Sequence, residues 1–130
     1  MASYRPCCIR IIRQVRIPGW AKKHVVRRHF PPKPEGRMSI FSNVYSPNFF
    51  FRIAVNILRS GQMQGEIHGN CLRYRIMFNN IVGTSVNGNP SKCIRVVCTT
   101  RKCLDAICQR TLPKEIKTIY PIESESPQRY

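Results

Sequence analysis

Alternating apolar and polar residues predict β-strands in several parts of the chain. The clearest alternation covers residues 71–78, where every second residue from Leu72 to Phe78 is apolar and Arg73 and Arg75 lie between them. A strand with this pattern buries one face and exposes the other. Residues 93–99 are predicted as a second strand, and residues 116–120 as a short edge strand.

The N-terminal residues 8–17 alternate as well, with isoleucine and valine at most positions of one parity. Arg10, Gln14 and Arg16 occupy the other parity. This pattern predicts a half-buried strand whose outer face is basic.

Residues 47–60 have the features of a helix. They follow Ser46, a residue type that caps helix N-termini, and they end before Gly61, which can adopt the left-handed conformation at a helix end. One narrow polar stripe at helical spacing crosses an otherwise apolar surface, so we expect most of this helix to be buried. The stripe consists of Asn48, Arg52, Asn56 and Arg59. A strand is the alternative, because phenylalanine and valine are strand formers.

Two further helices are predicted. Residues 20–30 form a short basic segment between Pro18-Gly19 and Pro31-Pro32. Residues 100–110 are predicted as a helix that ends before Pro113, and the alternative is a single helix from Ser91 to Gln109.

Turn-forming residues divide the chain into elements within one domain. Residues 31–37 are rich in proline and predict an extended connector, and residues 79–92 contain Asn-Gly and Asn-Pro pairs that predict hairpins. Isoleucine and valine together number 24 against 4 leucines, which favours a sheet. We therefore expect a small single α+β domain over residues 1–120, with an antiparallel sheet and two or three short helices. Residues 121–130 are predicted to be a flexible polar tail.

The charge of the chain points to a polyanionic partner. Lys and Arg number 22 against 6 Asp and Glu, a net charge of +16, and residues 1–34 form a basic N-terminal segment without any acidic residue. Such a surface binds phosphates and releases their counterions. RNA is favoured over DNA because aromatic residues lie among the basic ones and can stack on exposed bases. The predicted nucleic-acid-binding residues are Arg10, Arg13, Arg16, Trp20, Lys22, Lys23, Arg27, Arg28, Arg73, Arg75 and Lys92.

The seven cysteines raise the question of a metal. Their odd number argues against a closed disulfide framework and for reduced thiols. His68, Cys71, Cys93 and Cys98 are a candidate ligand set for one structural zinc, although their spacing is imperfect. The alternative is no cofactor at all, with the cysteines as buried, inert thiols.

The sequence offers little for catalysis or for a membrane span. Few carboxylates are present, and no glycine-rich phosphate loop occurs, so we expect a protein that is not an enzyme. No apolar stretch is long enough for a spanning helix, and arginines interrupt the apolar run that a secretory signal needs. An intracellular protein of the cytoplasm or nucleus is therefore expected. The alternative for residues 1–34 is a mitochondrial targeting segment.

Two short resemblances accompany these observations. The order Gly65-Glu-Ile-His68, then residues 72–78, then residues 82–92 and a helix resembles the later half of a double-stranded-RNA-binding domain, which would place His68 and Lys92 on RNA. The segments Arg16-Ile-Pro-Gly-Trp20 and Tyr45-Ser-Pro-Asn-Phe49 with a His/Cys pair are similar in order to lentiviral infectivity factors. Neither covers more than about half the chain, and neither identifies its family.

We therefore expect a small basic RNA-binding protein, such as a viral accessory or silencing-suppressor protein or a ribonucleoprotein component. The competing class is a secreted, disulfide-bonded cytokine-like or antimicrobial module. It is motivated by the cysteines and the high charge.

Overall fold

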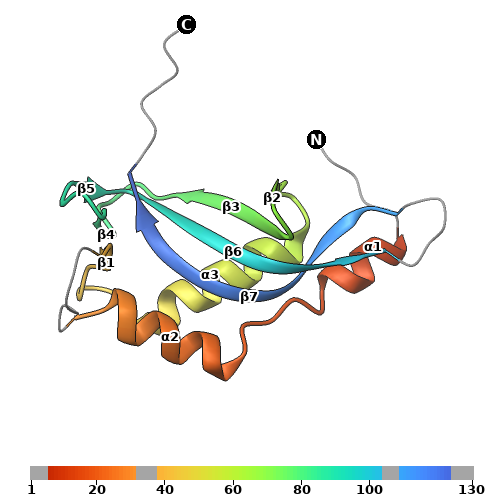
Figure 1. Cartoon of the computed structure of the whole chain (residues 1–130), viewed down its shortest axis with the longest axis horizontal. Coiled ribbons are helices and arrows are strands. Elements are labelled where there is room, and N and C mark those ends of the chain that lie inside the picture. Colours follow the sequence, from red (N-terminus) through yellow and green to blue (C-terminus); the bar gives the residue numbers. More distant parts are fainter. Residues whose placement is uncertain (1–5, 32–37, 104–108, 124–130) are drawn as a thin grey trace, which may run out of the picture.

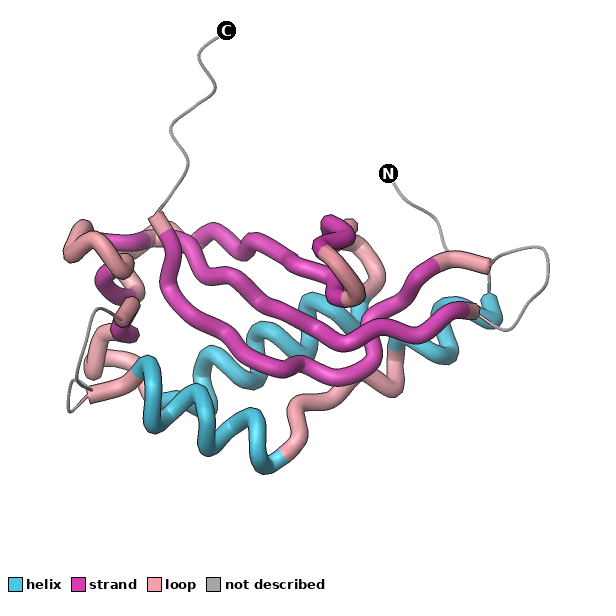
Figure 2. The backbone as a smooth tube through the Cα atoms, in the orientation of Figure 1, coloured by secondary structure: helices cyan, strands magenta, loops and turns pink. Residues whose placement is uncertain are grey.

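The four-stranded antiparallel sheet at the centre of the molecule has the strand order β2-β3-β6-β7. The structure is a computed structural model that describes residues 6–31, 38–103 and 109–123. A second, three-stranded antiparallel sheet has the order β1-β4-β5 and lies at one end of the first (Figures 1 and 2). The strands are β1 (Ile40–Phe41), β2 (Glu66–His68), β3 (Cys71–Met77), β4 (Gly83–Thr84), β5 (Pro90–Ser91), β6 (Cys93–Lys102) and β7 (Thr111–Ile122). The predicted α+β class is confirmed.

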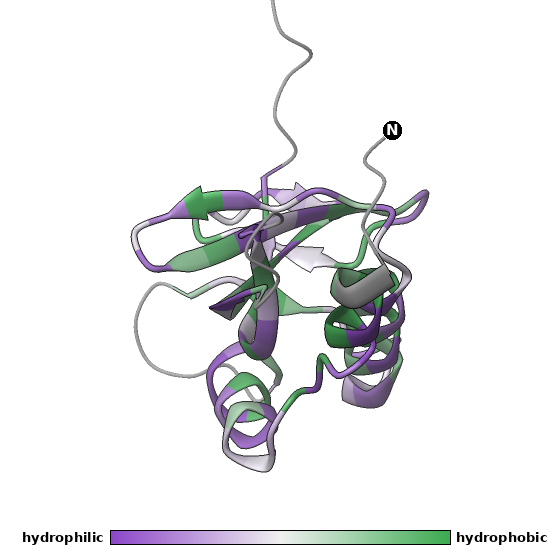
Figure 3. Cartoon of the chain, turned by 90° about the vertical axis from the view of Figure 1, so that its right-hand side faces the viewer, coloured by the Kyte–Doolittle hydropathy of each residue, from purple (hydrophilic) through white to green (hydrophobic). Residues whose placement is uncertain are grey.

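Three helices lie on one side of the larger sheet (Figures 1 and 3). They are α1 (Pro6–Ile12), α2 (Gly19–His29) and α3 (Pro47–Ser60). Phe50 of α3 is completely buried at the centre of the main core. The apolar faces of α2 and α3 join the core residues of β3, β6 and β7 there, which fixes the position of both helices against the sheet.

Helix α3 forms where the sequence predicts it, because both of its ends are capped. The Ser46 hydroxyl accepts a hydrogen bond from the Phe49 amide (3.2 Å), and Gly61 takes the left-handed conformation with φ +70°. All four residues of the polar stripe are exposed, as predicted.

Strand β3 confirms the alternation in the sequence. Leu72, Tyr74 and Ile76 are buried, and Arg73 and Arg75 are half-buried on the opposite face. Strand β6 pairs antiparallel with β3 on one side and with β7 on the other, and the register of the β6–β7 pair shifts near Cys98.

The predicted helix over residues 100–110 is wrong at its start. Thr100, Arg101 and Lys102 belong to β6 and pair with residues of β7. The single-helix alternative from Ser91 fails too, because β6 begins at Cys93. β-branched residues at positions 94–100 favour the extended chain, and pairing with β7 continues it. Residues 104–108 lie outside the described part of the chain. A double-stranded-RNA-binding domain would have its last helix here, and the described residues between 100 and 110 do not form it.

The predicted strand over residues 8–17 is also wrong. Residues 6–12 form α1, in which Cys8 and Ile12 lie one turn apart and are buried against Cys103 and Leu112. Ile9 is 38% exposed instead of being buried. The chain becomes extended only afterwards, where Arg16 forms a parallel bridge to Glu115 of β7.

The remaining connections fall partly outside the described residues. Most of the predicted connector at 31–37 does so, as do residues 124–130 of the predicted tail. The predicted hairpin at 79–92 is confirmed by the pairing of β4 with β5. Glu123, which the sequence assigns to the flexible tail, is instead held by hydrogen bonds from the side chains of Asn87 and Asn89.

Candidate nucleic-acid interface

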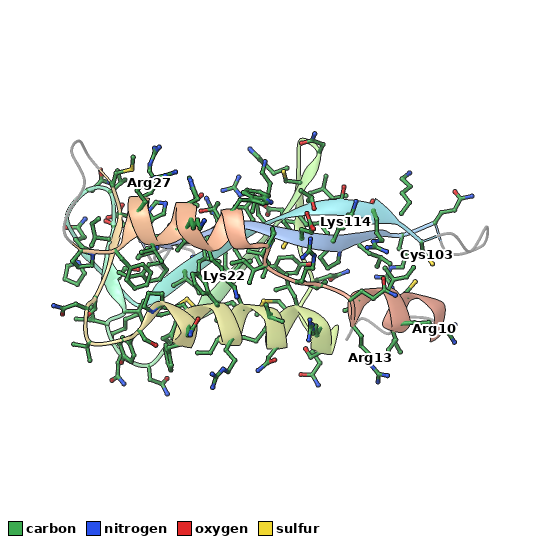
Figure 4. The ribbon with its side chains drawn as sticks, turned by 90° about the horizontal axis from the view of Figure 1, so that it is seen from below. Arg10, Arg13, Lys22, Arg27, Cys103 and Lys114 are labelled. Carbon is green, nitrogen blue, oxygen red and sulfur yellow. The ribbon has the colours of Figure 1, made fainter. Side chains whose placement is uncertain are left out.

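The three helices carry many basic residues and no acidic one. The sequences of α1, α2 and α3 contain no Asp or Glu. Their basic residues, together with Arg13 just after α1, form what we call the helical basic surface. It consists of Arg10, Arg13, Lys22, Lys23, Arg27, Arg28, Arg52 and Arg59, all exposed. Figure 4 shows Arg10, Arg13, Lys22 and Arg27 on this surface.

A groove of about 350 Å³ runs between α2 and α3 within this surface. Lys22 contributes from α2, and the polar stripe of α3 lines the other wall. Ile17, Phe51 and Val55 line it between the polar groups. Cations and side-chain amides at the rim of an apolar floor can bind a phosphate backbone and a base or sugar together.

Arg59 also has a structural role at one end of this groove. Its Nε donates a hydrogen bond to the Val15 carbonyl oxygen at 2.7 Å. The bond ties α3 to the chain between α1 and α2, so Arg59 positions the groove as well as adding charge to it.

Helix α2 concentrates positive charge on its exposed face. Lys23 and Arg27 are four residues apart, a spacing at which like charges destabilise a helix. Burial, then the charges of Arg28 and Arg27, lower the pKa of His24 below its usual range. A polyanion bound at α2 would relieve this repulsion.

Trp20, at the start of α2, is 57% exposed. The sequence places it both among the apolar residues of the helix and among the binding residues, and the structure leaves it outside the core. An exposed tryptophan beside lysines provides a surface on which a base can stack.

Arg16 differs from the other predicted binding residues because its guanidinium group already forms an ion pair with a carboxylate. Its Nε and NH2 atoms both donate to Oε2 of Glu115, at 3.1 and 2.7 Å. This ion pair accompanies the backbone bridge to β7, so Arg16 has a structural role in the described chain.

Arg73 and Arg75 lie on the other side of the sheet from the helices. They share that face with Arg95 of β6, which is directly opposite Arg75. The predicted binding residues therefore separate into two surfaces, and Lys92, exposed between β5 and β6, belongs to neither. Arg95 was missed by the sequence analysis, although the alternation within residues 93–99 places it on the face opposite Ile94 and Val96.

The four predicted zinc ligands are not brought together. His68 and Cys71 pair across β2 and β3, but Cys93 lies at the start of β6, next to Met77, and is fully buried like Cys98. Among the described residues, no group of three or more His, Cys, Asp or Glu side chains is placed to hold a metal. Within the described part of the chain, Cys71 and Cys98 are free thiols.

These two thiols should differ strongly in reactivity. Burial, then the nearby Cys71, raises the pKa of Cys98, so its thiol stays protonated at neutral pH. Cys71 is only half-buried. We expect iodoacetamide to label Cys71 in the native protein well before Cys98, as read by peptide mass spectrometry. Equal labelling rates, or a disulfide at either residue, would contradict the structure.

None of the helices in the described ranges is long and apolar enough to cross a membrane. Comparison of the chain with protein-family models, with curated proteins and with solved structures finds no match to any of them.

Proposed function

We propose that this protein binds nucleic acid, with RNA preferred to DNA, through its helical basic surface, as a binding protein rather than an enzyme. The observation that carries the proposal is the set of three helices without acidic residues, with a groove between α2 and α3. An intracellular role, as in a viral accessory protein or a ribonucleoprotein component, forms part of the proposal and is supported by the free thiols of Cys71 and Cys98.

Charge supplies the affinity in this proposal. The three acidic residues in the described ranges all lie outside the helices: Glu66, Glu115 and Glu123. Two of them are engaged, Glu115 by Arg16 and Glu123 by asparagines. The cations of the helical basic surface therefore face solvent without neighbouring carboxylates on their own helices. Each phosphate that they neutralise releases condensed counterions.

The preference for RNA rests on shape and on stacking. Duplex DNA is usually read by a helix or ribbon that enters the major groove, and such a helix projects from the protein. Here α2 and α3 lie side by side against the sheet and present a groove instead (Figure 4). A groove with cations, amides and the nearby exposed Trp20 fits a single strand or an RNA loop.

A titration tests the proposal. Labelled single-stranded RNA, duplex RNA and DNA of equal length are titrated with the full chain at several salt concentrations. We expect micromolar or tighter binding to RNA at low salt that weakens steeply as salt rises. Absence of RNA binding, or binding that does not depend on salt, would refute the proposed function. Tighter binding to DNA than to RNA would refute the preference.

A further inference from the structure

A hollow of about 270 Å³ lies where α2 meets edge strand β7 and the turn between β4 and β5, and we call it the histidine hollow. Its lining includes His24, His29, Met38, Val86, Thr118 and Tyr120. A second hollow of about 450 Å³ shares Met38 and Val86 with it, so the two adjoin. Ligand sites measure about 300 to 1,000 Å³, and the joined space therefore has room for a base with its ribose.

Aromatic rings form part of the histidine hollow. The ring of His29 stacks on that of Tyr120, with the centroids 5.4 Å apart. The ring of His24 meets His29 edge to face at 6.0 Å. His24 is only partly buried and makes no hydrogen bond with the described residues, so its ring is available to a ligand. Such a ring stacks on any base, since every base has a π-face.

Two polar atoms of the hollow have no protein partner. The Nδ1 atom of His29 donates to the Ser39 carbonyl oxygen at 2.9 Å. Burial is the main cause that lowers the pKa of His29, so the ring is neutral at pH 7 and its Nε2 is an acceptor. No described residue donates to this Nε2. Oγ1 of Thr118 is buried and has no hydrogen-bond partner among the described residues.

A cation lies at the rim of the hollow. Arg28 is exposed, and its NH2 atom is 4.0 Å from Sδ of Met38, which lines both hollows. Among the described residues, no acidic side chain lines either hollow. The charge therefore favours a ligand that carries a phosphate beside its aromatic part, as a nucleotide does.

We propose that the histidine hollow takes in one unpaired base of the bound RNA strand while Arg28 holds an adjacent phosphate. This inference rests on the proposed function for the choice of RNA. The base stacks on His24, and its edge bonds with Nε2 of His29 and the hydroxyl of Thr118. Bases in a duplex already use their faces and pairing edges, so the hollow selects single strands and loops.

The base hollow and the groove between α2 and α3 can be separated by mutation. They share no lining residue. Removal of a ring from the hollow should therefore weaken contact with a base and leave the phosphate contacts of the groove intact.

The test compares two strands of equal length and charge. One is single-stranded RNA, and the other is built from stable abasic units. Both are titrated with the full chain at fixed salt and pH 8, where imidazoles are neutral. Because one stacked base contributes at least about fivefold in affinity, wild type should bind the RNA strand about fivefold tighter or more. His24→Ala should weaken RNA binding by about fivefold or more and change the affinity for the abasic strand by less than about twofold.

His68→Ala is the matched control, because His68 is an exposed histidine of β2 outside both hollows. It removes the same neutral ring and should leave the affinity for both strands unchanged. An equal loss of RNA affinity in this control would contradict the assignment to the histidine hollow.

Thr118→Val is the second variant, and it keeps the test decisive should His24→Ala fail to fold by circular dichroism. Valine has the shape of threonine without the hydroxyl. Loss of an unpaired buried hydroxyl should leave the urea midpoint unchanged or raise it. Loss of its hydrogen bond to the base should weaken binding of the RNA strand by about twofold to tenfold. A Thr118 with only a structural role would not lower affinity while stability is kept.

The outcomes separate this inference from the proposed function. Failure of both strands to bind refutes the proposed function. Equal affinity of wild type for the two strands refutes the base hollow while the proposed function stands. Adenosine and uridine monophosphates are titrated in parallel. If they bind wild type but not His24→Ala while the two strands bind equally, the hollow takes a free nucleotide, and the strand is the wrong source.

Discussion

Replacement of Lys22, Arg27 and Arg52 together by glutamine is expected to lower the slope of log affinity against log salt by about 2 to 3 units. These residues are exposed and come from both α2 and α3, and their side chains make no hydrogen bond or ion pair with the residues that the structure describes. Lys22 and Arg52 line the groove, and Arg27 continues the charge along α2. Each cation that contacts a phosphate adds about 0.7 to 0.9 units to the slope, so three contacts account for the change.

The matched control removes three charges elsewhere. Lys92, Lys102 and Lys117 are exposed residues outside the helices, and their replacement by glutamine leaves the same net charge as the first variant. Its salt slope should stay within about half a unit of wild type. If both variants lose the same slope, binding follows net charge alone, and the assignment to the helical basic surface is wrong. Circular dichroism of both variants shows that the fold is retained.

Elements whose pattern and ends agree could be predicted from the sequence. Helix α3 has an apolar surface with one polar stripe, a serine cap and a glycine stop, and all of these appear in the structure. Strand β3 alternates without exception, and its buried residues are those of the apolar parity. In both elements the local preferences and the tertiary packing require the same conformation, so neither overrides the other.

The two wrong elements are those whose partners lie far away in the sequence. Ile12 falls on the polar parity of the predicted N-terminal strand, and this exception is the residue that α1 buries, beside Leu112 of β7. Residues 100–102 have a weak helical pattern, but pairing with residues 111–113 extends β6. For α1, contacts between residues about 100 positions apart decide the conformation, and for β6 the pairing with β7 decides it. A short stretch of sequence does not contain this information.

The sequence predicts the positive charge of the candidate site but not how the basic residues are arranged in space. The sequence shows that residues 1–34 lack acids, yet it cannot show that the α3 stripe faces α2 across a groove. Arg52 and Arg59 therefore appear in the sequence only as the polar side of a buried helix. Arg16 shows the reverse error, because a basic residue that looks available is paired with Glu115, 99 positions away. The tertiary fold is needed to tell which basic residues lie at the groove and which are already paired.

Phe50→Ala is expected to cost about 3 to 5 kcal/mol of unfolding free energy, the range for loss of a buried phenylalanine. Phe50 is 0% exposed, and its ring centroid lies 4.3 Å from that of Phe41 and 5.9 Å from that of Phe78. It therefore connects α3 to β1 of the smaller sheet and to the residue that follows β3 in the larger one. Because domains are stable by about 5 to 15 kcal/mol, urea denaturation should show a much lower midpoint or no folded baseline.

Phe49→Ala is the control: Phe49 is 38% exposed, so the same truncation should cost about 1 kcal/mol. Equal costs at the two positions would mean that the core does not centre on Phe50, and that the groove between α2 and α3 is not held in the way described.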